Sequence, residues 1–502
     1  MKLRHTTTRL NPGGIFPGRG LAWSAGLRHG AKLREITNSP CRRPALRLSP
    51  KCSERASVLI IVLWVCLGLV SIALYFANSM TYELRASDNR VSGLVSDQAI
   101  EGAARYVGYV LQNFATNGAV PATNQFAREA VPIGDAKFWL IGRDATGQNT
   151  TEPAFGLIDE GSKLNLNTAN TNTLSYLPNM TTDFAQAIMD WRGTNGVVSL
   201  DYATLGYLPK NAPFETVDEL RLVYGADISL LAGDDINRNG VLDANEKDST
   251  GTGQLNSGLF EYTTVWAREP NFHADGSSLT NVSTASPQTI QALLQADGVS
   301  SATTMAQSIW RYVHNTPGRV NNFNNILDLA LQCQRLGMSE ADFAKIYNDV
   351  TTSTNTYFRG RINVNTASAD VLTALFMGLN NNISQETASG AAQTLITYRE
   401  QNAGNLNSIW WLIDALGSNN QVITALAGST VNSGSGYVTT KSFQFTADIA
   451  AVGPFGRGYR RVKFIFDISN GSPIILYRQD LSRLGWALGE KARQTLVAKE
   501  TP

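Results

Sequence analysis

The chain has 502 residues, of which 43% are hydrophobic and 17% charged, a composition that excludes a disordered protein and predicts two or three domains. Residues 1–55 hold twelve Lys and Arg against two acidic residues, whereas the remainder holds 30 basic and 39 acidic residues, a formal charge of −9. This acidic remainder argues against nucleic acid as a partner. The spacing of the four Cys indicates neither a disulfide nor a zinc site.

Residues 1–56 form a basic leader rich in Arg, Pro and Gly, which is either a cytoplasmic segment or the product of a start codon placed too far upstream. From Ala56 to Ala77 the next 22 residues carry no charge. As a helix they would span about 33 Å, enough to cross the hydrocarbon core of a bilayer. The basic leader should stay in the cytoplasm, which places the bulk of the chain on the other side. Hydropathy alone would be satisfied by an uncleaved signal anchor.

An amphipathic pattern follows this apolar run. Apolar residues recur every three or four positions as one helical stripe, made of Val91, Leu94, Val95, Ala99, Ala103, Val107, Val110, Leu111 and Phe114. Asn117-Gly118 is a typical helix stop. The sequence therefore predicts one long helix that starts in the membrane and packs its second half onto a soluble domain.

The segment from Arg55 to Val65, RASVLIIVLWV, resembles the prepilin-peptidase site of a K-type minor pseudopilin of the type II, or general, secretion pathway. The resemblance implies cleavage between Ala56 and Ser57, although the family usually has Gly where Ala56 stands. Ile61 would be the fifth mature residue, where most pilins have Glu and K-type subunits do not. A Glu in the bilayer is costly unless a neighbour's amine pairs with it, so a subunit without it suits the tip of an assembly.

Strand patterns lie on both sides of a long central region. We expect strands at Lys137–Ile141, Ala154–Asp159, Ser442–Val452, Tyr459–Ile468 and Pro473–Leu481, with a turn at Asp144–Gly147. The predicted fold class is α+β: a transmembrane pilin-type helix packed on an antiparallel sheet, with a large, mainly helical insertion. The K-type resemblance implies an insertion of this kind.

The insertion contains an internal repeat. Residues 161–170, GSKLNLNTAN, match residues 359–368, RGRINVNTAS, and each copy continues into helical segments. The Asn-Thr steps are suited to capping a helix start. These two repeats resemble helix-hairpin-helix or SAM-like modules, many of which bind DNA, and a membrane-anchored DNA-binding or uptake protein is therefore the main alternative. Against it, the hairpins lack a Gly-x-Gly step, and residues 151–270 carry 17 acidic and 7 basic residues.

Residues 235–246, DINRNGVLDANE, match the calcium loop D-x-[DN]-x-[DN]-G-x5-E throughout. Calcium takes six to eight hard oxygen ligands. We predict side-chain ligands from Asp235, Asn237, Asn239, Asp243 and Glu246, and a backbone carbonyl from Val241. The flanking residues are poor helix formers, so we expect a structural calcium loop without two flanking helices.

These patterns divide the chain into seven segments: a leader (1–56), the long helix (57–118), the first strands (119–160), a first repeat that includes the loop at 235–246 (161–355), a second repeat (356–435), the last strands (436–490) and a tail (491–502). No nucleotide-binding, serine-hydrolase or zinc-protease motif is present, so no enzymatic activity is expected.

The expected function is that of a structural tip subunit of the type II secretion pseudopilus, in the inner membrane with its bulk in the periplasm. A minor type IV pilin is a further alternative. The resemblance implies as partners the I-, J- and H-type minor pseudopilins, the major pseudopilin, the prepilin peptidase and the inner-membrane secretion platform, with no nucleic acid.

Overall fold

The computed structural model describes residues 54–114, 117–144, 152–193, 202–314, 322–379, 382–429 and 436–498. Contacts divide the chain into two units, residues 1–76 and residues 77–502. The leader and the predicted turn from residue 145 onward lie outside the described residues. Ala56 and Ser57 lie in the first turns of the first helix.

The first unit is described from residue 54 onward and consists of the beginning of α1, a helix that runs from Glu54 to Gln112. From Val58 to Phe76 its side chains are exposed, including Leu63 and Trp64, each about two-thirds exposed. Among the described residues this is the one helix long and apolar enough to cross a membrane, judged by length and composition. The predicted single-pass anchor is consistent with this finding.

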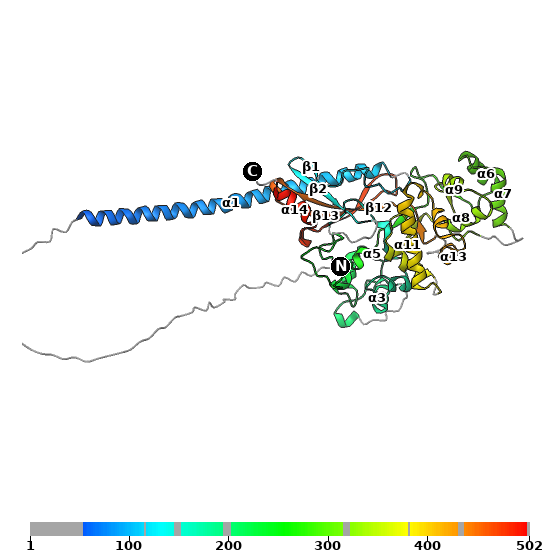
Figure 1. The fold of residues 1–502 in the computed structure, drawn as a ribbon, viewed down its shortest axis with the longest axis horizontal. Helices are drawn as coiled ribbons and strands as arrows, with labels where there is room; N and C mark the ends of the chain where they lie inside the picture. The colour runs from blue at the N-terminus through cyan, green and yellow to red at the C-terminus, as the bar shows by residue number, and fades with distance from the viewer. Residues whose placement is uncertain are drawn as a thin grey trace, which may run out of the picture. The chain divides into compact units, whose positions relative to one another are not determined.

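An antiparallel sheet lies beside α1 in the second unit (Figure 1). Its strands follow the order β1-β2-β12-β13-β14, and β3 also pairs with β12. The bounds are Val131–Ile133 for β1, Ala136–Ile141 for β2, Ile158–Asp159 for β3, Gln444–Val452 for β12, Arg460–Asp467 for β13 and Ile474–Asp480 for β14. The first strands of the chain thus pair with the last ones, and the residues between them are an insertion. The predicted α+β class is confirmed at this level.

The second half of α1 covers one face of this sheet. Alternate residues of β2, Phe138 and Leu140, are buried in the same core as Ile100, Val107 and Leu111 of α1. This alternation is what a pleated strand between two layers requires. Trp139 and Ile141 point to the opposite face, where the C-terminal helix α14, Gly489–Ala498, packs against them.

The predicted stripe on α1 is wrong at its beginning. Val91 and Leu94 are 55% and 59% exposed, whereas Ser92 and Ser96 are buried. Gly458, with φ +69°, lies so close to the backbone of Ser92 that a Cβ would clash with it. Close backbone approach therefore selects the small residues for the buried face. The helix also ends at Gln112, before the predicted stop at Asn117-Gly118.

The insertion is mainly helical and shares one large hydrophobic core. Its helices are α2 Thr171–Ser175, α3 Thr182–Arg192, α4 Ile228–Ala232, α5 Leu259–Tyr262, α6 Pro287–Ala296, α7 Ala302–Val313, α8 Ile326–Arg335, α9 Glu340–Ile346, α10 Ala369–Leu379, α11 Gln385–Gln401, α12 Trp411–Leu416 and α13 Gln421–Gly428. Its short strands are β4 Leu164–Asn165, β5 Thr263–Thr264, β6 Arg268–Pro270, β7 Thr280–Asn281, β8 Val350–Thr351, β9 Tyr357–Arg359, β10 Ile362–Asn363 and β11 Val438–Thr439.

Three segments of the insertion share one local plan. Each starts with a two-residue strand, passes through helices and returns to a second short strand that pairs in parallel with the first: β4 with β5, β7 with β8, and β10 with β11. The sequence predicts two repeats. The third segment, from Thr280 to Thr351, lies within residues 161–355, where the sequence predicts a single repeat. Its helices α6 to α9 lie together at one end of this unit (Figure 1).

Matching hydrogen bonds hold the first and last of these segments. Arg192, at the end of α3, donates to the carbonyls of Leu166 and Ala169. Arg399, in α11, donates to those of Val364 and Ala367, the corresponding positions of the last segment. A buried Arg therefore fastens the second helix to the turn before the first helix in both segments.

Candidate metal centre

The predicted calcium loop lies between α4 and α5 and is anchored at both ends. Asp234 N–H donates to the carbonyl of Asn256, and Gly233 forms an isolated antiparallel bridge with Ser257. No helix occurs from residue 247 to residue 258, as expected from the sequence. Backbone contacts therefore hold the two ends of the loop side by side.

The first half of the loop wraps its backbone around Asp235. One carboxylate oxygen of Asp235 accepts the N–H of Asn239 at 2.9 Å, and the other accepts the N–H of Gly240 at 2.8 Å. Gly240 has φ +85°, a conformation that costs a glycine little, and Arg238 also has positive φ. The side-chain oxygens of Asn237 and Asn239 accept N–H groups two residues further on. These turns bring the first three predicted side chains to one side of the loop.

The second half closes on the same centre. Asp243 Oδ2 lies 2.5 Å from Nδ2 of Asn237 and 2.8 Å from Nδ2 of Asn239. Glu246 accepts the N–H of Asn237 with one carboxylate oxygen and the N–H of Asp243 with the other. The structure therefore brings the five predicted side-chain ligands together.

The donor set fits a hard cation. The carboxylate of Asp243 meets the carboxamides of Asn237 and Asn239, and Glu246 closes the loop through the N–H groups of Asn237 and Asp243, so the residue types are the oxygen donors that calcium prefers. Within the described residues no group of three or more His, Cys, Asp or Glu side chains is arranged to hold a metal ion, so a calcium site here would also need the side-chain oxygens of Asn237 and Asn239. Val241, which is predicted to contribute a backbone carbonyl, is buried, with 2% of its surface exposed.

Burial raises the pKa of Asp235, against the lowering effect of Arg143 and of the backbone N–H groups at Gly240 and Asn239. Burial also raises the pKa of Glu246. Burial thus disfavours the charged form of both carboxylates, and a bound cation would offset that cost.

Two arginines clamp the loop from the side of the sheet. Arg461 of β13 is fully buried and donates to the backbone carbonyls of Asn237 and Arg238. The same guanidinium forms a bidentate pair with Asp448 of β12, at 2.8 and 2.6 Å. Arg143, just after β2, also donates to the carbonyl of Arg238. These contacts tie the loop to β13 and to the residues that follow β2.

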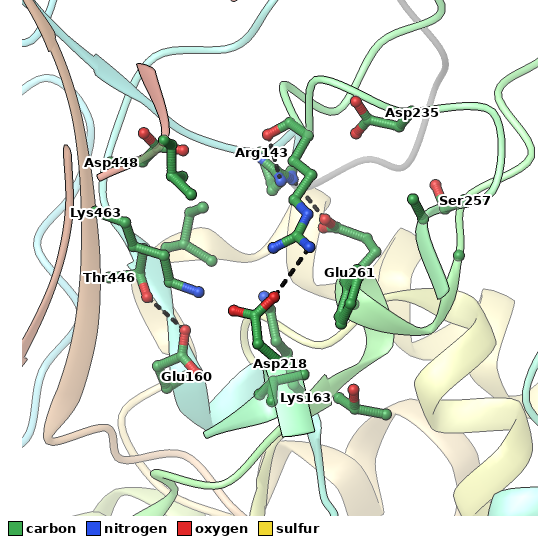
Figure 2. Close-up of a pocket in the computed structure, with 18 residues that line it drawn as sticks. Arg143, Glu160, Lys163, Asp218, Asp235, Ser257, Glu261, Thr446, Asp448 and Lys463 are labelled. Atoms are coloured by element: carbon green, nitrogen blue, oxygen red, sulfur yellow. Dashed lines mark hydrogen bonds and ion pairs between the residues drawn. The ribbon is translucent and has the colours of Figure 1, made fainter. Parts of the chain in front are cut away.

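A small cavity of about 50 Å³ lies beside this clamp and is lined by charged side chains. Figure 2 shows Arg143 with its partner Glu261, and Asp218, facing this space. Arg143 Nε and Glu261 Oε2 are 2.7 Å apart. The cavity is too small for a substrate-sized molecule, and its lining includes the ion pairs Arg143–Glu261 and Arg238–Asp218.

Sequence reasoning identified the loop but missed Arg461, Asp448 and Arg143. Arg461 precedes Val462 in a strand where polar and apolar residues alternate, a pattern that favours an exposed Arg461, so no local signal marks it as buried. Its partners come from distant parts of the chain, so their identity required the fold. Of the other predicted sites, Ile61 is 61% exposed on α1.

A scan against models of known protein families gives no match, and a comparison with curated proteins gives none either. Among solved structures, the chain is similar to one in the crystal structure of the GspK-GspI-GspJ complex from the enterotoxigenic Escherichia coli type 2 secretion system. The match has 15% identity and a TM-score of 0.15, and it covers 43% of this chain and 75% of that one. A TM-score of this size does not establish a common fold.

Proposed function

We propose that this protein is a membrane-anchored minor pseudopilin of the K type, a structural tip subunit of the type II secretion pseudopilus. The proposal rests on the course of helix α1. One continuous helix begins with an exposed, uncharged stretch long enough for a bilayer, and its later residues are buried against an antiparallel sheet. This is the arrangement expected of a subunit that is held in a membrane and assembled through its helix.

The role is mechanical, and the protein is not an enzyme. The anchor helix packs among the helices of I-, J- and H-type minor pseudopilins and the major pseudopilin, after prepilin peptidase has cut between Ala56 and Ser57. The helical insertion between β3 and β12 adds bulk that prevents another subunit from stacking above. The protein lies in the inner membrane, contacts the secretion platform there and exposes its bulk to the periplasm.

Calcium in the loop at 235–246 would be structural. The bound ion supplies positive charge for Asp235 and Glu246, two carboxylates that burial otherwise penalises. The chain contributes the ligands, while Arg461 and Arg143 hold the loop backbone against the sheet. Binding would thus stiffen the junction between the insertion and the sheet.

The placement at the tip predicts the effect of a glutamate at Ile61. In a secretion-deficient strain that lacks its own K-type subunit, the unaltered chain should restore export of a reporter enzyme to the medium. Ile61→Glu should bring no gain, because a carboxylate in the bilayer costs about 2.5–3.5 kcal/mol when no neighbour's amine pairs with it. Ile61→Leu is the matched control and should behave like the unaltered chain. Export that requires Glu at this position would refute the tip placement.

The calcium prediction is tested by isothermal titration of the full chain in detergent. The unaltered protein should bind calcium and melt at a higher temperature with it, since a ligand at 1,000 times its Kd adds about 4 kcal/mol to stability. The Asp235→Ala/Glu246→Ala variant should lose both effects. Asp275→Ala removes an exposed acid from a distant turn and should retain them. Equal binding by all three proteins would show that calcium binds elsewhere.

A further inference from the structure

The C-terminal segment, residues 485–498, lies against the calcium loop and ends in α14. Ala487 and Leu488 are almost fully buried, and they share a core with Trp139 on the face of the sheet opposite to α1. Residues 485–488 belong to no helix or strand. The position of this part of the segment therefore depends on side-chain packing and on hydrogen bonds to other parts of the chain.

Two carboxamides of the calcium loop bond to the backbone of this segment. Asn237 Nδ2 donates to the carbonyl of Trp486 at 3.1 Å, and Asn239 Nδ2 donates to that of Ala487 at 3.4 Å. Both nitrogens also donate to Asp243 within the loop, so each amide has a partner for both of its hydrogens. Asn237 and Asn239 are 4% and 1% exposed, so these bonds are shielded from water.

The oxygens of the same two carboxamides belong to the loop side. They accept the N–H groups of Asn239 and Val241, and the calcium motif uses oxygens at these two positions as ligands. A carboxamide whose oxygen binds a cation is more strongly polarised, so its N–H groups become stronger donors. A cation would also compete with those N–H groups for the carboxylate of Asp243. Calcium in the loop would therefore strengthen the two bonds to the C-terminal segment.

We propose that calcium binding and docking of the C-terminal segment are linked through Asn237 and Asn239. The ion holds the segment on the sheet, and the docked segment orients these two predicted ligands. The proposal rests on the calcium site at residues 235–246 proposed above. Linkage is reciprocal, so the factor by which calcium favours docking is the factor by which docking raises calcium affinity, typically about 5- to 150-fold. Loss of calcium would uncover the apolar face that includes Trp139.

The test uses the full chain in detergent, with calcium alone as the ligand. Amide hydrogen exchange followed by mass spectrometry reports the opening of residues 485–498, and titration calorimetry reports calcium affinity. Calcium should slow exchange in this segment of the unaltered chain at least about fivefold. In the Asp235→Ala/Glu246→Ala variant, which should not bind calcium, exchange should not respond to it.

The double variant Asn237→Asp/Asn239→Asp separates ligation from docking. Aspartate fits the calcium motif at both positions, but its carboxylate cannot donate to a carbonyl. The variant should still bind calcium, and calcium should no longer slow exchange in residues 485–498. Asn124→Asp, a like change at an exposed residue before β1, should leave both effects in place.

Leu488→Ser tests the linkage from the other side. Leu488 is 1% exposed in the core beneath α14, so the substitution loosens the segment without altering a predicted ligand. Calcium affinity should fall at least about fivefold. Leu476→Ser, at an exposed position of β14, is the matched control and should not change it. Melting temperatures would verify that each variant is folded.

Two results would overturn the linkage while the calcium site stands. One is calcium binding that Asp235→Ala/Glu246→Ala abolishes but that leaves exchange in residues 485–498 unchanged. The other is a Leu488→Ser variant that binds calcium as tightly as the unaltered chain. If the unaltered chain binds no calcium, the proposed site fails and the linkage fails with it.

Discussion

Arg461→Leu is expected to lower the free energy of unfolding of the second unit by about 3–5 kcal/mol, because it leaves Asp448 buried without its partner. Arg461 has no exposed surface, and the side chain of Asp448 is 5% exposed. The substitution also removes the donor that the carbonyls of Asn237 and Arg238 share. Calcium affinity should therefore fall together with stability, which a merely local packing defect would not produce.

The neighbouring Arg460 supplies a matched control. It pairs with Asp97 of α1, but the two side chains are 42% and 52% exposed. Exposed ion pairs contribute about 0–1 kcal/mol, so Arg460→Leu should be close to neutral. Thermal melts and urea titrations in detergent, with and without calcium, would measure both variants. Equal losses from Arg460→Leu and Arg461→Leu would contradict the assignment of Arg461 as the clamp.

The double variant Arg461→Leu/Asp448→Leu distinguishes the charge from the contact. Replacement of a whole buried ion pair by apolar residues is often neutral or stabilising. We expect the double variant to recover most of the global stability that Arg461→Leu loses. Calcium affinity should stay low, because the carbonyl of Asn237 still lacks its donor and Arg143 alone holds that of Arg238.

The parts of the fold that follow from local pattern were predictable. The apolar run predicted α1, and the late β-rich segments predicted β12, β13 and β14 to within two residues, since burial on one face leaves a periodic pattern in the sequence. Strand β1 was not predicted, and of the predicted strand Ala154–Asp159 only Ile158–Asp159 is a strand. The exposure of Val91 and Leu94 was not predictable in this way. Periodicity records which residues are apolar, whereas the closeness of Gly458 to α1 makes residue size decisive there.

The middle segment of the insertion carries a motif similar to that of the last segment, with one residue changed. Residues 281–286, NVSTAS, match residues 363–368, NVNTAS, at five of six positions. The difference is Ser283, which stands where the other two segments have Asn167 and Asn365. Those Asn side chains bond to distant backbone groups, whereas Ser283 Oγ is buried with no hydrogen-bond partner among the described residues. A search of the sequence for Asn-x-Asn therefore does not find this segment.

The loop ligands were predictable because calcium binding uses residues close in sequence. The contact of Arg461 with Asp448 was not, because these residues come together only through strand pairing. They lie on neighbouring strands whose register places Arg461 opposite Ala450.

Asp159→Ala should be about as damaging as the loss of Arg461. Asp159 is 5% exposed, at the end of β3, where the sheet meets the last repeat. One carboxylate oxygen accepts from Gly161 N–H and the Ser442 hydroxyl. The other accepts from Asn363 Nδ2 at 2.8 Å and from Thr366 Oγ1 at 2.5 Å.

Truncation leaves these buried donors without an acceptor, at about 1–3 kcal/mol for each unsatisfied group before relaxation. Because the groups share one network, the losses will not add, and we expect a total of about 3–5 kcal/mol. Asp135→Ala, at an exposed turn between β1 and β2, is the control and should cost less than about 0.5 kcal/mol. Urea titration of both variants gives the comparison.

The pH dependence of this effect has a definite sign. Burial raises the pKa of Asp159, although the four hydrogen bonds lower it. A carboxyl with a raised folded-state pKa contributes most stability below its unfolded pKa of about 3.9 and loses part of that contribution as the pH rises towards the folded pKa. The stability gap between the unaltered chain and Asp159→Ala should therefore narrow as the pH is raised above about 4. A gap that widens with pH would mean that the hydrogen bonds outweigh burial and that this carboxyl is stabilised as the anion.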